Sequence, residues 1–203
     1  MAKKLESNLR NMILSLMIIS VVMSAALGYV YLLTKGPIEA ANKQKEVSAV
    51  TEVIPAFDND PTTSSKIIDG LTFYEGTKDG KLVGTAVKTF TEKGFSGRFD
   101  MMVGFLPDGT INKTTVIEHK ETPGLGSKMT NPKFKDQFNG KKPSEFKMKV
   151  KKDGGQVDAI TAATISSRAY CDGIQKAYDL YMTNYVNNTP DSADTVEMKG
   201  VTQ

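Results

Sequence analysis

The sequence predicts an α+β protein in which a single N-terminal transmembrane helix is followed by one domain with a mainly antiparallel sheet and flanking helices. Three observations predict this class. A long uncharged segment lies near the start, β-rich runs punctuated by glycine fill the middle, and helical periodicity returns near the end. The roughly 150 residues that follow the uncharged segment are enough for one domain with its own core.

The uncharged segment runs from Met12 to Leu33 and is 22 residues long. As a helix it extends over about 33 Å, which is enough to cross the hydrocarbon core of a bilayer. Small residues between Ser24 and Gly28 favour close packing against other membrane helices. A cleaved secretory signal is the alternative, because basic residues precede the segment and small residues lie near Ala26. The apolar run is longer than a typical signal core, which favours an uncleaved anchor.

The charges beside this helix do not fix its orientation. Three basic residues lie on each side within similar reach, namely Lys3, Lys4 and Arg10 before it and Lys35, Lys43 and Lys45 after it. A short arm and a large following domain favour the arm inside the cell and the domain outside. The expected organisation is a cytoplasmic arm (1–11), the transmembrane helix (12–33), a linker helix and loop (34–60), the folded domain (61–186) and a disordered tail (187–203).

The elements of the domain follow from periodicity and turn residues. Apolar residues among charges from Pro37 to Ile54 predict an amphipathic helix that ends before Pro55. A cluster of Pro, Asp, Ser and Thr from Asp58 to Ser65 predicts a loop. Strands are expected at 71–74, 82–90, 99–106 and 110–118, the first two joined around Gly76 to Gly80 and the last two by Pro107-Asp108-Gly109.

Lysine and apolar residues alternate strictly from Lys147 to Lys151. A period of two is typical of a strand, so this pattern predicts an edge strand whose lysines form its solvated face. A binding patch is the less favoured interpretation.

Composition excludes several kinds of chemistry. The 26 basic and 23 acidic residues leave a net charge of +3, which is no concentrated positive field, so nucleic-acid binding is not expected. The single cysteine, Cys171, cannot form an internal disulfide, and with one histidine there is no ligand cluster for zinc, an iron–sulfur centre or haem. We therefore expect no metal site, and any redox chemistry needs an organic cofactor or a partner's metal.

A helix is predicted from Ser166 onward, because apolar residues recur at three- and four-residue spacings as far as Tyr185. Ser166 or Ser167 is the expected N-cap. The first turn of a helix has unpaired N–H groups and the positive end of the helix dipole, so a phosphate is stabilised there.

The residues before this helix, Asp158-Ala-Ile-Thr-Ala-Ala-Thr164, resemble the acceptor sequence on which a flavin transferase esterifies FMN to a threonine. That pattern is an aspartate, two variable residues, Ser or Thr, a small residue, Ala and the acceptor Thr. Asp158, Thr161, Ala162, Ala163 and Thr164 fill its places in order, with alanine at Ala162 where the family usually has glycine. The alternative is an ordinary capped helix with a start rich in Ser and Thr.

A second group of residues, Glu118 to Gly126, directly follows the predicted hairpin. Gly124 and Gly126 free the backbone to turn sharply, so this loop can place amides and Leu125 against a flat ring. His119 within it is more simply explained as a surface or hydrogen-bonded histidine than as a catalytic one.

Together the Glu121 to Gly126 loop, the Met102 to Gly109 hairpin, the acceptor run and the membrane helix resemble the Rnf complex G subunit, whose FMN-binding domain family also includes the Nqr C subunit. The short chain favours Rnf. The resemblance implies FMN bound covalently by a phosphoester to Thr164, with no catalytic acid or base and no metal. The implied cofactor-binding residues are Thr164, Thr161, Ala163, Ile165, Ser166, Ser167, Glu121, Thr122, Gly124, Leu125 and Gly126, and the implied recognition residue for the flavin transferase is Asp158.

The same resemblance implies an electron-carrier subunit of a membrane ion-translocating ferredoxin:NAD oxidoreductase, a translocase complex of the inner cell membrane. Its expected partners are the other membrane and redox subunits and, during maturation, the flavin transferase, with the FMN domain on the extracytoplasmic side. Two alternatives stay open. One is a membrane-anchored FMN-domain protein for binding, assembly or regulation, and the other is the C subunit of a sodium-pumping NADH:quinone oxidoreductase.

Overall fold

The computed structural model describes residues 8–63 and 65–186, so the expected tail 187–203 and most of the expected arm lie outside the described residues. The chain forms two compact units that divide between Lys45 and Glu46. A single helix, α1 (Leu9–Val53), contributes to both units.

Within the first unit, α1 contains the uncharged segment 12–33, and all of its side chains there are exposed. Among the described residues, α1 is the one helix long and apolar enough to cross a membrane. Pro37 lies inside α1 and supplies no backbone N–H to the helix. The helix ends at Val53, which confirms the predicted stop before Pro55.

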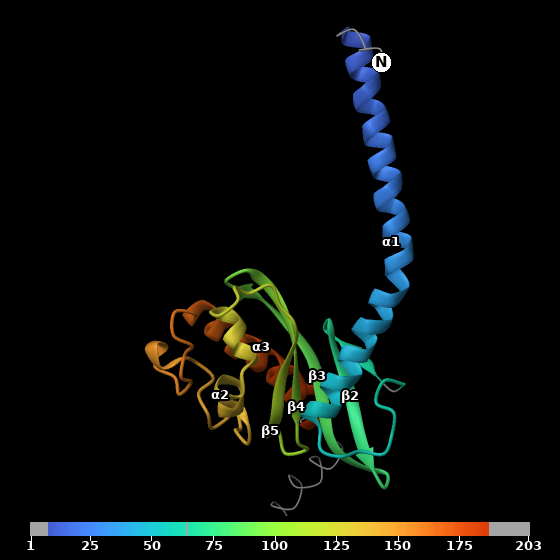
Figure 1. The fold of residues 1–203 in the computed structure, drawn as a ribbon. Helices are drawn as coiled ribbons and strands as arrows, with labels where there is room; N and C mark the ends of the chain where they lie inside the picture. The colour runs from blue at the N-terminus through green and yellow to red at the C-terminus, as the bar shows by residue number, and fades with distance from the viewer. Residues whose placement is uncertain (1–7, 64, 187–203) are drawn as a thin grey trace, which may run out of the picture. The chain divides into compact units, whose positions relative to one another are not determined.

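Five antiparallel strands form the sheet of the second unit, in the order β1-β2-β3-β4-β5 (Figure 1). They are β1 (Lys66–Ile68), β2 (Leu71–Lys78), β3 (Lys81–Gly94), β4 (Gly97–Phe105) and β5 (Ile111–Glu118). The four predicted strands are confirmed, three of them longer than expected, whereas β1 was missed because it has only three residues. Two-residue Asp-Gly turns join β1 to β2 and β2 to β3, and Asp69, Gly70, Asp79 and Gly80 have positive φ angles of 48°, 77°, 51° and 73°. Such turns match the twist of the strands that they join.

Both faces of this sheet are covered, because successive side chains along each strand point to opposite sides. Helix α3 (Thr164–Tyr181) packs in one buried cluster with residues such as Phe73 and Met101. Their sequence neighbours Tyr74 and Met102 lie in a second cluster, with Ala49, Val50 and Val53 from the end of α1. A Cβ atom on Gly104 of β4 would lie 2.0 Å from the carbonyl oxygen of Val53, so glycine allows this close approach.

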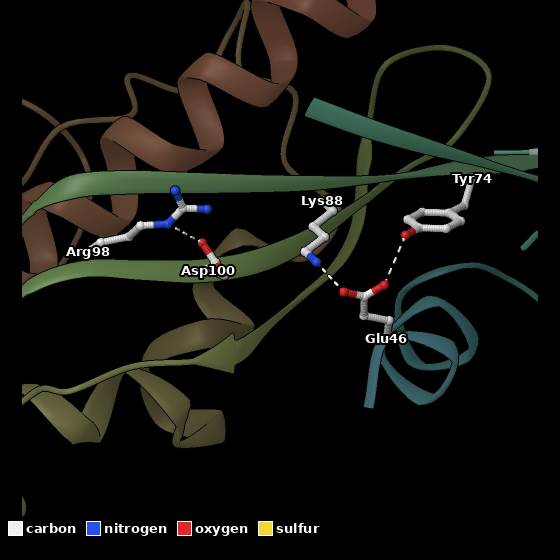
Figure 2. A network of polar contacts seen from close by, with 5 residues as sticks. All are labelled: Glu46, Tyr74, Lys88, Arg98 and Asp100. Atoms are coloured by element: carbon white, nitrogen blue, oxygen red, sulfur yellow. Dashed lines mark hydrogen bonds and ion pairs between the residues drawn. The ribbon is translucent and has the colours of Figure 1, made fainter. Parts of the chain in front are cut away.

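A polar network joins the end of α1 to the sheet (Figure 2). Glu46 pairs with Lys88 of β3 and accepts a hydrogen bond of 3.3 Å from the hydroxyl of Tyr74 on β2. Burial and the neighbouring Glu46 carboxylate raise the pKa of Tyr74 to about 12. On β4, Arg98 pairs with Asp100 at 2.9 Å.

The edge strand predicted at Lys147 to Lys151 is wrong. Met148 and Val150 are buried and the lysines exposed, so the alternation in burial is present, but no strand pairs along this segment. Val150 forms one isolated bridge with Val157. The short helix η3 (Lys151–Asp153) then begins, because Asp153 N–H bonds back to the carbonyl of Val150. Other short helices that periodicity could not reveal are η1 (Gly126–Thr130), α2 (Pro132–Lys135) and η2 (Asp136–Phe138). The π-helix η4 (Met182–Val186) directly follows α3 and falls within the helix predicted as far as Tyr185.

Candidate functional site

The site begins at the N-terminus of α3, which starts at Thr164 with Ala163 as its N-cap and no side-chain cap. The predicted caps, Ser166 and Ser167, are therefore wrong and lie in the first turn. Both hydroxyls are buried and form hydrogen bonds with other residues of the domain. The hydroxyl of Ser167 accepts a hydrogen bond from Ile160 N–H and donates to the carbonyl of Ala163, both at 2.9 Å, and so holds the preceding turn against the helix.

This helix start leaves backbone donors open. The N–H groups of Thr164, Ile165 and Ser166 have no acceptor among the described residues, and the first helical bond runs from Ser167 N–H to Ala163 at 3.1 Å. The positive end of the helix dipole points in the same direction as these groups. Thr164 is half-buried at the first helical position. The start of α3 thus has the open amides and the dipole end that favour a bound phosphate group, without a strand-and-glycine nucleotide motif.

Ala162 adopts a left-handed backbone conformation, with φ of 61°. This region is costly for residues with a Cβ atom and free for glycine. The acceptor pattern usually has glycine at this place, and the backbone supplies the reason. The side chain of Ala162 is exposed, so it meets no steric obstacle beyond its own backbone.

Glu121 organises the other side of the site. Its side chain is only 4% exposed, and its carboxylate accepts hydrogen bonds from the hydroxyl of Ser166 at 2.9 Å and from Ser96 N–H at 3.2 Å. One buried carboxylate thus connects α3, the β3–β4 hairpin and its own loop. Two glycines leave room for it, because Cβ atoms on Gly94 and Gly126 would lie 2.6 Å and 2.3 Å from its oxygens.

These elements enclose a cavity of about 320 Å³, which is in the range of small-molecule sites. It is lined by eight residues expected from the sequence, namely Glu121, Thr122, Leu125, Gly126, Ala163, Thr164, Ile165 and Ser166, together with Phe95 and Ala162. The expected residues Thr161, Gly124 and Ser167 do not line it. Gly124 turns the loop with φ of 77°, and Ser167 lies buried behind the first turn of α3.

Phe95 was missed by the sequence reasoning. It lies in the turn of the β3–β4 hairpin, within Gly94-Phe-Ser-Gly97, and is 66% exposed. An aromatic residue flanked by glycines at a hairpin turn was the available signal. With Leu125 and Ile165, which are 41% and 47% exposed, it gives the cavity an apolar rim.

Asp158, the expected recognition residue, and His119, for which no site role was favoured, do not line the cavity. The Asp158 side chain is exposed and pairs with Lys151 at 2.6 Å, so it does not line the cavity. His119 is half-buried, and its Nδ1 accepts a hydrogen bond of 3.2 Å from Glu121 N–H, in agreement with the structural interpretation of this histidine.

This site lies in a recognised class of domain, because residues 94–179 match the family model of the FMN-binding domain. The chain is 33% identical to the G subunit of the ion-translocating oxidoreductase complex of Methanosarcina acetivorans, over 86% of this chain and 95% of that protein. It is also 33% identical to the G subunit of the Na(+)-translocating ferredoxin:NAD(+) oxidoreductase complex of Acetobacterium woodii, over 83% of this chain and 89% of that protein.

The chain therefore belongs to the family of G subunits of ion-translocating oxidoreductase complexes, as the sequence resemblance implied. Its fold is also similar to the crystal structure of the C subunit of the Na(+)-translocating NADH-quinone reductase from Parabacteroides distasonis. The TM-score is 0.51, at 20% identity over 68% of this chain and 81% of the other.

Proposed function

We propose that this chain carries electrons through FMN bound covalently, by a phosphoester, to the hydroxyl of Thr164, as a subunit of an ion-translocating ferredoxin:NAD oxidoreductase complex. The observation that carries the proposal is the position of Thr164, half-buried at the start of α3 beside the three open amides and a cavity of about 320 Å³. The names of the relatives support the complex, and the FMN-binding domain match supports the cofactor.

The residues of the site fit such a group. The amides of the first turn of α3 suit the phosphate, and the exposed apolar side chains of Phe95, Leu125 and Ile165 suit a flat ring. When bound, FMN supplies the electron-carrying chemistry, while the protein supplies position and electrostatic surroundings. Glu121 fixes the loop relative to α3 through Ser166, so its role is to position the walls of the cavity.

Replacement of Thr164 tests the covalent link. Thr164→Val keeps the side-chain shape and removes the hydroxyl, so we expect peptide mass spectrometry to show loss of the FMN adduct. Thr161→Ser is the matched control, because the acceptor pattern allows Ser or Thr at this place and Thr161 does not line the cavity, so it should keep the adduct. Undiminished adduct in Thr164→Val, retained on Thr161 or Ser166, would refute the assignment. Wild-type protein without flavin, made in a host that has the transferase, would instead favour a role in binding or assembly.

The proposal extends to maturation. Asp158 lies six residues before the acceptor and its side chain is exposed, so a flavin transferase can reach it without unfolding the domain. Asp158→Asn should lower flavin loading in cells while the urea unfolding midpoint stays unchanged.

We place the FMN domain on the extracytoplasmic side of the cell membrane, anchored by the segment 12–33. The test uses Lys78→Cys, at an exposed position in the second unit, since the native Cys171 is buried and burial raises the pKa of its thiol to about 12. A membrane-impermeant maleimide added to intact cells with a permeable outer barrier should label this variant. Labelling that appears only after lysis would place the domain in the cytoplasm.

A further inference from the structure

A second and larger concavity, which we call the basic groove, lies beside the FMN cavity. Its volume is about 830 Å³, and its walls are the N-terminal half of α3 and the segment 147–153. The buried side chains of Met148, Val150 and Ala169 contribute apolar surface to it. Met148, Val150 and Ala169 do not line the FMN cavity, so the basic groove is distinct from it, although Ile165 lines both.

The charge of the basic groove is positive. Four cations line it, Lys93, Lys147, Lys149 and Arg168, against two carboxylates, Asp153 and Asp172, so its formal charge is +2. Both carboxylates are already paired. Arg168 holds Asp153 with two bonds of 2.7 Å, and Lys93 pairs with Asp172.

Lys147 and Lys149 are therefore the two lining cations that are available to bind a carboxylate of another molecule. Both are exposed, and neither forms an ion pair with any carboxylate among residues 8–63 and 65–186. The buried side chains of Met148 and Val150 hold the backbone so that these lysines face outward. The backbone that carries the two amines is therefore held by buried side chains, while the amines themselves face solvent.

The basic groove is adjacent to the FMN cavity. Ile165 lines both the basic groove and the FMN cavity, so a molecule seated in the groove lies next to the site of the cofactor. The surface is concave and has an apolar wall, which suits inserted side chains of a protein better than a flat lipid surface. Its excess positive charge is complementary to carboxylates.

We propose that the basic groove docks an acidic surface of a neighbouring protein subunit of the membrane complex, through Lys147 and Lys149. This contact holds the redox partner at the exposed rim of the FMN cavity. The purpose of the contact rests on the proposed function, whereas the contact itself can be tested without reference to flavin.

Zero-length crosslinking of the complex isolated from membranes is the direct test. A water-soluble carbodiimide joins a lysine amine to a carboxylate in contact with it. We expect peptides that link Lys147 or Lys149 to Asp or Glu of another subunit. The double variant Lys147→Arg/Lys149→Arg keeps the charge but has no reactive amine there, so it should lose these crosslinks.

Charge reversal supplies the functional readout. Lys147→Glu/Lys149→Glu should lower ferredoxin-dependent NAD reduction by about tenfold at low ionic strength, and added salt should reduce the difference from wild type. Lys78→Glu/Lys81→Glu is the matched control. These lysines flank the Asp79-Gly80 turn, at the end of β3 opposite to the FMN cavity, and their reversal should leave turnover unchanged.

Three outcomes overturn the proposal. Crosslinks confined to Asp191, Asp194 or Glu197 would show that the chain's own tail occupies the basic groove. The absence of crosslinks to other subunits at both lysines would point to a lipid surface, because phosphate headgroups form no amide. Unchanged turnover after charge reversal of Lys147 and Lys149 would show that the basic groove does not contribute to electron transfer. Flavin loading, measured on the same samples, reports separately on Thr164, so loss of flavin with retained crosslinks would refute only the proposed function.

Discussion

Removal of the Ser166 hydroxyl is the sharpest test of how the site is held together. Glu121 is 4% exposed, and Ser166, which is 1% exposed, supplies one of the two hydrogen bonds recorded for its carboxylate. Ser166→Ala leaves that oxygen buried without a donor. A hydrogen bond to a charged group contributes about 1.5–3 kcal/mol, so we expect the free energy of unfolding to fall by about 2 kcal/mol.

Urea unfolding of the full chain in detergent, followed by circular dichroism, measures this loss. With a slope of about 2 kcal/mol per molar urea, a loss of about 2 kcal/mol lowers the midpoint by about 1 M. A double-mutant cycle with Glu121→Gln isolates the pair from other effects of each substitution. We expect a coupling energy of about 1–2 kcal/mol between the two positions.

A coupling energy below about 0.5 kcal/mol would refute the reasoning, because distant and independent sites already agree within that limit. The separate unfolding losses would then come from local packing around each side chain. Glu121 could no longer be regarded as the residue that fixes the loop to α3.

Three further perturbations follow from the structure. Ala162→Gly should raise the free energy of unfolding by about 0.5–1 kcal/mol, since relief of the left-handed strain outweighs the added freedom of the unfolded chain, and an unchanged or lower urea midpoint would contradict this. In the folded state the pKa values of Tyr74 and Cys171 are about 12, above their ordinary values of 10.0 and 9.0. The free energy of unfolding should therefore be full below pH 9 and should fall as the pH rises from 9 through 12. Equal urea midpoints at pH 8 and pH 11 would exclude this linkage. Glu46→Gln removes the partner charge of the half-buried Lys88 and should lower stability by about 1 kcal/mol, as a shift in the same urea assay would show.

The strands were predictable because their signals are local. Apolar runs and the turn expected around Gly76 to Gly80 were enough to locate β2 and β3, although both strands extend beyond the predicted ranges. The caps of α3 were not predictable in this way. Ser166 is 45 residues from its partner Glu121, and only the folded chain shows that its hydroxyl is already engaged there.

The segment Lys147 to Lys151 also shows that a local sequence pattern does not reveal partners that are distant in sequence. Alternation in a sequence predicts alternation in burial, which is present here, but it cannot show whether a neighbouring strand exists to pair with. Phe95 was missed for a related reason. Its part in the cavity depends on where the β3–β4 hairpin meets the Glu121 loop, and the glycines that flank Phe95 indicate a turn but not that contact.

Contacts that stabilise one face of the sheet are distinct from those that form the FMN cavity on the other face. The end of α1 packs on one face with Tyr74 and Met102, whereas α3 and the core beneath the FMN cavity belong to the other cluster. The side-chain contacts of Glu46 to the sheet among residues 8–63 and 65–186, with Lys88 and Tyr74, are on the first of these faces. Loss of that contact should therefore lower the unfolding free energy without lowering flavin loading on Thr164, whereas Ser166→Ala should lower both. A Glu46 variant that is destabilised and also poorly loaded would show that the sheet transmits changes from one face to the other.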